Sequence, residues 1–484
     1  MKQDYDLIVL GGGSAGLTAA GMAAQLGVRT LLVERHKLGG ECLNTGCIPS
    51  KALVRSANVA ALMSRASEYG LGFGGQVDFP AVMDRVAQVI RRIEPHDSAE
   101  TLARYGVETQ FGQAAFLSNH EVQLNGSTLR SSKFVIATGS RPFVPPLEGL
   151  TDYLTNETLF SIRNQPAHLV IVGAGPVGVE MAQAFRRLGS NVTLLERAPR
   201  ILPREDEEIS AHAAVSLKAD GVRIYVDAKL LSDRVESSRV GIIHTITLDH
   251  HGTQESITGD ALLVAAGRFP NFEELNLDKA GIIADRQGIR IDNRCRTTAP
   301  NIFACGDVTG HFQFTHMAEY QAKVAVSNAI LHWPMKLDYR AVPWAIFTDP
   351  EIARVGLTEL EARKQFGSVT IFRSSFLDED RAIVDGSNSG MIKVIASKNG
   401  RKILGAHIIG PRASEIIMEF VIAMQHGLSV ADLSNTIHPY PSYSLAARHA
   451  ADGYWLKKSS PTLVRWIQRI FGYSGPIAER FRGD

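Results

Sequence analysis

The chain has 484 residues, which at roughly 150 residues per domain predicts about three domains. Its 51 Lys and Arg residues against 50 Asp and Glu residues leave a net charge of +1, which argues against a nucleic-acid-binding protein. No stretch approaches the roughly 18 apolar residues of a membrane-spanning helix, and residues 1–6 lack the cationic start of a secretory signal. We therefore expect a cytoplasmic globular protein.

A short apolar run, residues 5–10, leads directly into a glycine-rich segment and then a stretch rich in Ala and Leu. This order predicts a buried strand, a tight turn and a helix. In the dinucleotide fingerprint Gly11 permits the turn, Gly13 lets the backbone approach a pyrophosphate, and Gly16 allows close packing of the helix. The next apolar run ends in Glu34, where a carboxylate accepts hydrogen bonds from ribose hydroxyls. We expect the pyrophosphate on the helix N-terminus.

The same arrangement recurs after the apolar run at residues 168–172, with the three glycines Gly173, Gly175 and Gly178. A second acidic residue, Glu196, closes the unit, and each landmark lies 162 positions after its first-copy counterpart. One glycine fingerprint can be only a tight strand-to-helix turn, but two matched copies predict that the chain binds two dinucleotides.

The acidic residue of the second unit bears on the choice of nicotinamide. A carboxylate at Glu196 pairs with a free 2′-hydroxyl and repels a 2′-phosphate, so NADH is favoured. Arg197 and Arg200 follow closely and could accommodate a phosphate, which leaves NADPH open.

Two of the four cysteines, Cys42 and Cys47, lie close together after the first unit. Such a pair is more typical of redox catalysis or metal binding than of a structural framework. A disulfide needs Cα atoms within about 7 Å, so the chain between them must bend, which Gly46 permits. Pro49 suits the first turn of a helix that runs to Met63, and a thiolate at a helix N-terminus has a lowered pKa. Two buried free thiols or a zinc site are the alternatives, but no second ligand pair lies nearby.

Residues 39–51, GGECLNTGCIPSK, together with both glycine fingerprints, resemble the flavin-dependent pyridine nucleotide-disulfide oxidoreductases, the family of dihydrolipoamide dehydrogenase, glutathione reductase and mercuric reductase. The resemblance covers about residues 4–453. Further family motifs follow in order: ATG at 137–139, AAGR at 265–268, TAPNIFACGD at 298–307, FTDPE at 347–351 and GAH at 405–407. It implies an α/β protein with two Rossmann-like dinucleotide-binding domains and an α+β C-terminal dimerisation domain.

The resemblance also implies domain boundaries. The FAD-binding domain would comprise residues 1–150 and 270–340, with the NAD(P)-binding domain inserted at 151–269. The interface domain would be residues 341–455, followed by a basic amphipathic tail at 456–484.

By the same resemblance, Cys47 is the thiol against the flavin and Cys42 the outer thiol that meets the substrate. Lys51 and Glu180 match an ion pair beside the flavin, and Asp307 is expected to bind the ribityl and pyrophosphate region of FAD. The remaining expected cofactor-binding residues are Gly40, Thr138, Gly139 and Gly267. No metal site is implied, and the other two cysteines, Cys295 and Cys305, are expected to be buried apolar residues.

The chain departs from the family near its C-terminus, where relatives usually carry a segment like HAHPTLSE with a catalytic His and a Glu that orients it. The ungapped match is HPYPSYSL, which places Tyr440 at the His position and Leu445 at the Glu position. A shifted register would let His438 serve instead. A His shuttles protons near neutral pH, whereas a Tyr is mostly a fixed donor. Mercuric reductase also has Tyr there but relays metal through C-terminal cysteines, and this chain has none after Cys305.

Beyond Lys457 and Lys458, five apolar residues follow the spacing of one helix face: Leu463, Trp466, Ile467, Ile470 and Phe471, with Arg465 and Arg469 between them. This stripe would either pack on its own protein or form a basic amphipathic helix that contacts a membrane surface or a partner.

The resemblance implies a homodimer in which Tyr440 of one subunit faces Cys42 of the other. Electrons would pass from NADH through FAD to the Cys42–Cys47 disulfide and on to a disulfide or thiol-bound acceptor, as in dihydrolipoamide dehydrogenase. The alternatives are a mercuric reductase-like metal-ion reductase and a flavoprotein that carries electrons, for example to quinones, while docked at the inner face of the membrane.

Overall fold

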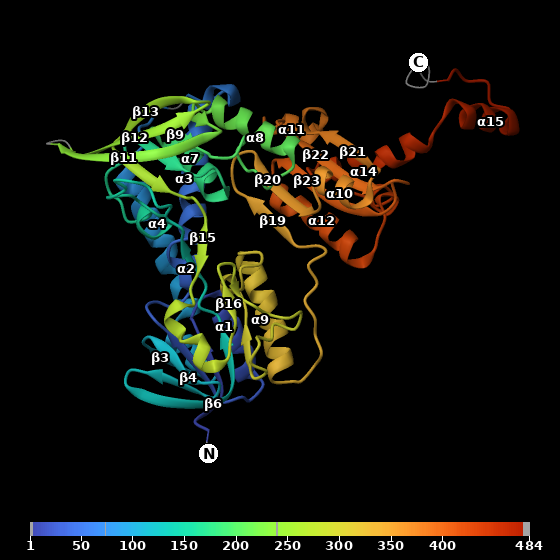
Figure 1. The fold of residues 1–484 in the computed structure, drawn as a ribbon. Coiled ribbons are helices and arrows are strands. Elements are labelled where there is room, and N and C mark those ends of the chain that lie inside the picture. The colour runs from blue at the N-terminus through green and yellow to red at the C-terminus, as the bar shows by residue number, and fades with distance from the viewer. Residues whose placement is uncertain (1–2, 73, 239–240, 478–484) are drawn as a thin grey trace. The chain divides into compact units, whose positions relative to one another are not determined.

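The computed structural model describes residues 3–72, 74–238 and 241–477 (Figure 1). The chain divides into two compact units. The first consists of Met1–Leu202 and Leu217–Asp338, and the second of Pro203–Ser216 and Tyr339–Asp484. Each unit combines helices with sheets, so the mixed α/β class expected from the sequence is confirmed.

The first unit begins with a seven-stranded sheet in the order β3-β2-β1-β6-β5-β4, in which a late strand, β18, also pairs with β6. The predicted first strand, residues 5–10, is confirmed. The next apolar run begins at residue 28, and the second strand begins two residues later, at Thr30. The strands are β1 Tyr5–Leu10, β2 Thr30–Glu34, β3 Val107–Phe111, β4 Ala114–Ser118, β5 Glu121–Leu124, β6 Ser127–Ile136 and β18 Ile302–Ala304. Strands β1, β2, β3, β6 and β18 run parallel, so their carboxyl ends lie at one edge.

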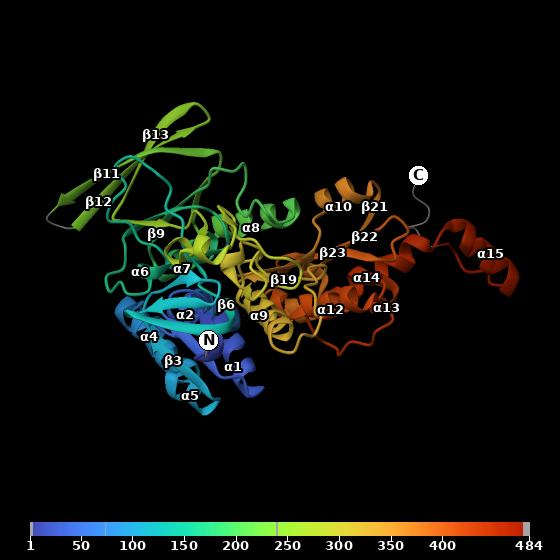
Figure 2. The same ribbon diagram turned by 60° about the horizontal axis from the view of Figure 1, so that its bottom comes forward.

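Helices α1 and α9 lie side by side (Figures 1 and 2), and both share an apolar core with this sheet. The helices associated with the sheet are α1 Ser14–Gln25, α2 Gly40–Asn44, α3 Cys47–Ser64, α4 Phe79–Ile93, α5 Ala99–Arg104 and α9 Thr315–Ala329. Helix α1 is rich in Ala, and its buried alanines allow close approach to the strands.

A second parallel sheet, β10-β9-β8-β14, repeats the pattern of the first. Leu7 pairs with Thr30 in the first sheet, and Leu169 pairs with Val192 in the second, which preserves the shift of 162 residues. Its elements are β8 His168–Val172, α7 Pro176–Leu188, β9 Asn191–Leu195, β10 Arg223–Tyr225 and β14 Ala261–Val264, preceded by α6 Asn156–Leu159.

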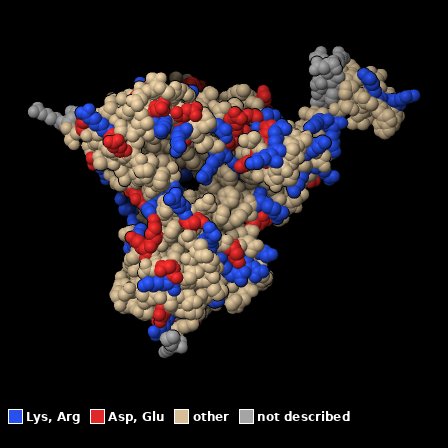
Figure 3. All heavy atoms as spheres, in the orientation of Figure 1, with Lys and Arg blue, Asp and Glu red and all other residues tan. Residues whose placement is uncertain are grey.

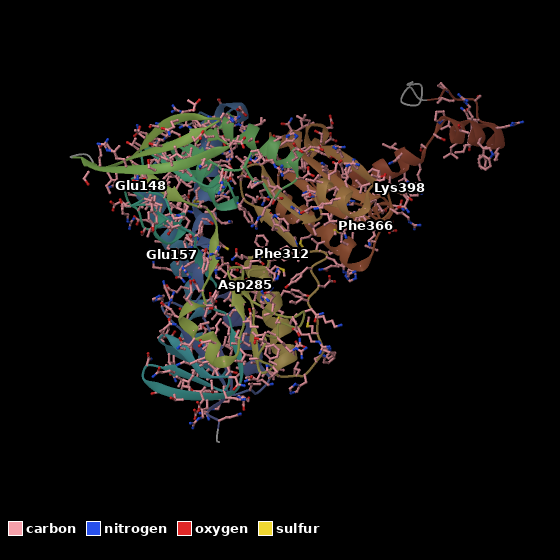
Figure 4. All side chains as sticks on the ribbon, in the orientation of Figure 1. Glu148, Glu157, Asp285, Phe312, Phe366 and Lys398 are labelled. Carbon is pink, nitrogen blue, oxygen red and sulfur yellow. The ribbon has the colours of Figure 1, made fainter. Side chains whose placement is uncertain are left out.

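An antiparallel sheet of three strands, β11 Ala228–Ser238, β12 Gly241–His250 and β13 Thr253–Gly259, packs its apolar side chains with those of the second parallel sheet. The chain segment that leads into the second parallel sheet contains Glu148, labelled in Figure 4. Glu148 forms a β-bridge with Ser232 of β11. Two short strands, β7 Ser140–Pro142 and β15 Arg268–Pro270, pair antiparallel with each other. In the sequence, β7 precedes the strands of the second parallel sheet and β15 follows them. The remaining pair is β16 Ala284–Asp285 with β17 Gly288–Ile289.

The second unit is built on a five-stranded antiparallel sheet in the order β19-β20-β23-β22-β21. Helices α12 and α14 pack on this sheet around a core that includes Phe372, Phe376 and Phe420 (Figure 1). The strands are β19 Pro343–Ile346, β20 Glu351–Gly356, β21 Val369–Ser375, β22 Met391–Ser397 and β23 Ile403–Gly410. The helices are α10 Glu359–Phe366, α11 Asp380–Val384, α12 Ala413–His426, α13 Val430–Ser434 and α14 Leu445–Lys458.

Residues 203–216 differ from the expected boundaries, because they belong to the second unit although they fall within the range 151–269. They include the first part of α8 Glu207–Ala219. Lys393 of β22, whose side chain is only 3% exposed, donates hydrogen bonds to Asp206 at 2.9 Å and to Glu208 at 2.7 Å. A buried ammonium is costly unless carboxylates pair with it. These hydrogen bonds therefore hold residues 203–216 against the sheet of the second unit. The other domain boundaries stay a prediction.

The amphipathic helix predicted in the tail is present as α15 Pro461–Phe471. None of the residues of α15 is buried. Among the described residues, the apolar face of this helix therefore does not pack into the protein. The last part of the predicted tail, residues 478–484, lies outside the described residues. A search of the described helices for one long and apolar enough to cross a membrane finds none.

Candidate active site and dinucleotide sites

The first glycine turn joins the carboxyl end of β1 to the start of α1. Gly11 has φ +106°, and a Cβ there would lie 2.3 Å from the carbonyl oxygen of Ala137. A Cβ at Gly16 would lie 1.7 Å from the carbonyl oxygen of Gly11. The backbone N–H of Gly12 donates to Oε2 of Glu34 at 2.6 Å. The hydrogen bond therefore joins the turn to the acidic residue, and the close backbone contacts leave no room for a side chain at Gly11 or Gly16.

The second turn reproduces these contacts. The N–H of Ala174 donates to Oε2 of Glu196 at 2.8 Å, and a Cβ at Gly178 would lie 1.9 Å from the carbonyl oxygen of Gly173. A Cβ built at Gly175 would meet no atom within 4 Å, so the backbone at this turn faces open space. At the corresponding Gly13, the nearest atom would be 3.7 Å away. Both turns thus leave room for a phosphate beside a helix N-terminus, as a bound dinucleotide requires.

The cysteine pair lies on two consecutive helices. Cys42 is in α2, and Cys47 is the first residue of α3, which places Pro49 in the first turn of that helix as predicted. The expected bend is made by Thr45 and Gly46, which caps α3 with φ −126° and ψ −108°. Both cysteines are free thiols in this structure, Cys42 half-buried and Cys47 exposed. The bend therefore brings one thiol to a helix N-terminus and the other beside it.

The two thiols have opposite electrostatic environments. The pKa of Cys47 is lowered to about 6, first because Cys42 donates a hydrogen bond to it, and further by Thr315 and the Lys51 ammonium. The same hydrogen bond and burial raise the pKa of Cys42. Cys47 therefore favours the thiolate near neutral pH while Cys42 keeps its proton. A redox-active cysteine pair needs one such thiolate, because the thiolate is the reactive form.

Thr315 was not identified from the sequence. Its Oγ1 lies 3.4 Å from Sγ of Cys47, although 268 residues separate them. It is the first residue of α9, shortly after the motif that ends in Asp307. Its position shortly after a family motif was the only indication in the sequence that Thr315 belongs to the site, because a threonine by itself does not indicate a function.

The ion pair expected from the family resemblance is present. Nζ of Lys51 lies 2.8 Å from Oε2 and 3.1 Å from Oε1 of Glu180, whose side chain is 4% exposed. Lys51 is four residues after Cys47 on α3, so the ammonium lies about one helical turn from the thiolate. A nearly buried carboxylate with two contacts fixes the position of this cation.

Four polar side chains meet where three family motifs end. Arg268 donates to both carboxylate oxygens of Glu41, at 2.6 Å for Oε1, and to Oγ of Ser140 at 2.8 Å. Ser140 in turn donates to Oδ2 of Asp307 at 2.6 Å. Burial raises the pKa of Glu41 to about 7 despite the arginine. Glu41 and Ser140 were missed by sequence reasoning; their adjacency to Cys42 and to Gly139 was the available signal.

The remaining expected cofactor-binding residues line the same loops. A Cβ at Gly40 would lie 2.6 Å from Cα of Gly13, so the cysteine segment touches the first glycine turn. Oγ1 of Thr138 donates to the carbonyl of Asn271 at 2.5 Å. Gly139 and Gly267 have φ of +69° and +127°. The structure thus gathers these residues around the turn, the cysteines and Asp307.

Tyr440 and His438 lie in the second unit with contrasting surroundings. Tyr440 is 74% exposed, and its hydroxyl donates to Oδ2 of Asp380 at 2.8 Å, which raises the pKa of the phenol. His438 is held inward, with Nε2 3.0 Å from Glu419 and Nδ1 2.9 Å from a backbone carbonyl. Leu445 is buried at the start of α14. Of the two registers, the structure leaves Tyr440 as the outward side chain.

Cys295 and Cys305 are fully buried in the core beside α1 and α9. Burial raises the pKa of Cys305 to about 12 and also raises that of Cys295. They behave as the small apolar residues that the sequence predicts. Among the residues that the structure describes, no cluster of three or more His, Cys, Asp or Glu side chains could hold a metal ion.

Comparison with known proteins agrees with this geometry. The family described as pyridine nucleotide-disulphide oxidoreductase matches residues 5–322, and its dimerisation domain matches residues 342–451. Mercuric reductase of Lysinibacillus sphaericus is 34% identical over 457 residues, 93% of this chain and 82% of that protein. Dihydrolipoyl dehydrogenase of Chlamydia muridarum is 35% identical over 452 residues, 91% of this chain and 95% of that protein.

A solved structure is similar over the same length. The Cu(II) complex of the HOCl-induced flavoprotein disulfide reductase RclA from Escherichia coli superimposes with a TM-score of 0.82 and 30% identity. The match covers 93% of this chain and 99% of RclA.

Proposed function

The chain belongs to the pyridine nucleotide-disulphide oxidoreductases, and from this premise we propose that it passes electrons from NADH through FAD to a Cys42–Cys47 disulfide and on to a disulfide or thiol-bound acceptor. It is an FAD-dependent, NAD(P)H-using enzyme, as its family and relatives are, and its dimerisation domain supports a homodimer. One observation carries the proposal: Cys47 begins α3, with Cys42 beside it on α2 and Lys51 one helical turn further along α3, bound to Glu180.

FAD held at the first glycine turn would supply the hydride chemistry with the nicotinamide and the two electrons that reduce the Cys42–Cys47 disulfide. The chain's own residues then carry out the exchange. Cys42 attacks one sulfur of the acceptor disulfide, and its proton leaves with the displaced sulfur. The Cys47 thiolate attacks Sγ of Cys42, which re-forms the Cys42–Cys47 disulfide and releases the second acceptor sulfur. That sulfur takes a proton from the solvent, so one disulfide is reduced for each two electrons.

We assign FAD to the first glycine turn and the nicotinamide to the second. In the first site Gly11, Gly13, Gly16 and Glu34 would surround the pyrophosphate and ribose, and Asp307 would hold the ribityl side. The second site would use Gly173, Gly175, Gly178 and Glu196, and the Glu196 carboxylate favours NADH over NADPH. Lys51, held by Glu180, would supply positive charge beside the flavin ring. Gly40, Thr138, Gly139 and Gly267 would complete the loops that enclose the cofactors.

We assign Tyr440 of one subunit to the acceptor site beside Cys42 of the other. Because Asp380 raises the pKa of Tyr440, the phenol stays protonated at neutral pH. On acceptor binding its single O–H would turn from Asp380 to the departing acceptor sulfur, acting as a hydrogen-bond donor and not as a base. This predicts slow turnover of dithiols such as dihydrolipoamide, whose oxidation needs a base.

A second candidate function is reduction of a soft metal ion held by the two thiols. Tyr440 at the acceptor position favours it, and mercuric reductase is among the relatives. The chain has no cysteine after Cys305 to relay a metal ion, so the ion would have to reach Cys42 directly.

We further propose a cytoplasmic enzyme whose tail, residues 456–484, contacts either the inner face of the membrane or a partner. In that setting a quinone is a third class of acceptor.

The test is NADH oxidation by the holoenzyme with lipoamide, glutathione disulfide, a quinone and mercuric ion in the presence of thiol. Turnover of a disulfide that falls at least about 100-fold in Cys42→Ser is the expected result. Cys295→Ser is the matched control, because that cysteine is fully buried in the core and has no role in the proposal, and it should retain wild-type rates. Equal disulfide turnover by wild type and Cys42→Ser would exclude the proposal, and turnover of mercuric ion alone would favour the second candidate.

A further inference from the structure

Helix α15 lies outside the part of the chain that the family shares. The dimerisation domain match ends at residue 451, whereas α15 spans Pro461–Phe471. RclA is matched over 99% of its own length while 93% of this chain is covered. Oxidoreductase chemistry on this fold therefore does not require α15, and its pattern calls for a separate explanation.

Local signals define this helix without help from packing. Oγ of Ser460 accepts a hydrogen bond from the N–H of Leu463 at 3.1 Å, and Pro461 occupies the first turn. Gly472 ends the helix with φ +70°. Capped at both ends but only 11 residues long, such a helix is marginal in water unless its apolar face is covered.

The apolar face is broad and uncovered in the described chain. Trp466 is 61% exposed and Phe471 63%, and Leu463 and Ile470 are exposed on the same side. Arg465 and Arg469 occupy the opposite face. Large aromatic and aliphatic side chains on one face with arginines on the other are typical of helices that lie in a membrane interface.

The charge of the segment indicates which partner covers it. Between Asp452 and Glu479 the chain contains four basic residues and no acidic one. Residues 457–484 carry a net charge of +4, whereas residues 1–456 carry −3. Figure 3 shows Lys and Arg atoms, and no Asp or Glu atoms, on the face of α15 in view. An anionic surface therefore attracts the tail but not the body, and two copies of the tail repel each other.

We propose that α15 lies in the plane of an anionic phospholipid bilayer, with its apolar face in the acyl boundary and its arginines among the headgroups. At about 16 Å the helix is too short to span a hydrocarbon core of about 30 Å. A bilayer offers an apolar layer under anionic headgroups, which matches both faces. The inference makes specific the tail contact proposed above, and the homodimer would present two such helices and strengthen weak binding.

The experiment is sedimentation of the full-length holoenzyme with vesicles of phosphatidylcholine alone or with added phosphatidylglycerol. We expect binding only to the anionic vesicles, weakened by salt, and at least about tenfold weaker in Trp466→Ser/Phe471→Ser and in Arg465→Glu/Arg469→Glu. The control is Lys364→Glu/Lys398→Glu, which makes the same charge change at exposed positions outside the tail and should bind like wild type (Figure 4).

Three outcomes would overturn the inference: no binding by wild type, equal binding to both vesicle types, or binding that the tail variants leave unchanged. A tail-dependent increase in the mass of the oligomer without vesicle binding would assign the face to a second copy of the chain instead. NADH oxidation measured on the same samples reports separately on the proposed function, because none of these substitutions touches a cofactor or cysteine site.

Discussion

The hydroxyl of Tyr440 donates a hydrogen bond of 2.8 Å to Oδ2 of Asp380, 60 residues earlier in the chain. Asp380 begins α11, whereas the position where relatives have an orienting glutamate is the buried Leu445. The structure thus supplies a carboxylate from a different element. The hydrogen bond to this carboxylate, and then its charge, raise the pKa of the phenol, so this position holds a proton where a histidine would exchange it.

Replacing Tyr440 by His should give the protein an acid-base group at this position. We expect Tyr440→His to raise the rate of dithiol oxidation about tenfold and to introduce a pH dependence near 6.5, the usual pKa of histidine. Asp380→Asn should lower the pKa of Tyr440 toward its ordinary value, because the raising charge is lost. The measurement is the pH profile of kcat with dihydrolipoamide. A profile that Tyr440→His leaves unchanged would remove Tyr440 from the acceptor site.

The pKa of Cys47 should depend on the hydrogen bond from Cys42. Cys42→Ala removes the largest cause that lowers it, so the pKa should rise above about 6, whereas Cys42→Ser retains a hydroxyl donor and should raise it less. The midpoint is read from the pH dependence of thiolate absorbance in the reduced protein. Midpoints equal to that of wild type in both variants would show that the hydrogen bond from Cys42 does not set the pKa of Cys47.

The acidic residues of the two dinucleotide units should control different cofactors. Glu196→Ala removes the carboxylate that repels a 2′-phosphate, and we expect the preference for NADH over NADPH to fall at least about tenfold in kcat/KM. Glu34→Ala is the matched control, because Glu34 makes the equivalent contact in the first unit. It should weaken FAD retention and leave the ratio for the two nicotinamides unchanged. A changed ratio in Glu34→Ala instead would reverse the assignment of the two sites.

The buried Lys393 should be a large contributor to stability. Its ammonium contacts Asp206, Glu208 and Glu359 within 2.9 Å. Glu208 and Glu359 also bind arginines, but Lys393→Met removes the ammonium from the buried Asp206 and should cost about 3–5 kcal/mol. Urea unfolding followed by circular dichroism measures the loss. Lys398→Met, at an exposed position near the end of the same strand, should change stability by less than about 0.5 kcal/mol. A similar small effect of both would contradict a structural role for the cluster.

Acid should weaken the same cluster. Hydrogen bonding to Arg373 and Lys393 lowers the pKa of Glu208 to about 2 from 4.5. A carboxyl whose pKa falls on folding stabilises the native state above its unfolded pKa, so this contribution is lost as the pH drops from 4.5 toward 2. Arg373→Met should flatten that part of the stability profile, measured by thermal unfolding across the same range. Equal slopes in wild type and variant would show that other carboxyls govern it.

The features that the sequence alone identified depend on local signals. Both glycine turns, the bend between Cys42 and Cys47, and helix α15 follow from turn glycines, caps and apolar spacing within about 25 residues. The Lys51–Glu180 pair came from the family resemblance instead, because 129 residues separate its members.

Only the tertiary structure decided which distant side chains meet. The network of Glu41, Arg268, Ser140 and Asp307 depends on three separate pairings: β6 and β18 run parallel and end side by side, β7 pairs antiparallel with β15, and α2 brings Glu41 to Arg268. The placement of residues 203–216 depends on a lysine inside another sheet, and Asp380 reaches Tyr440 from a helix with no motif of its own. Such contacts have no local signature, since their energies arise from burial and charge pairing that the folded chain alone creates.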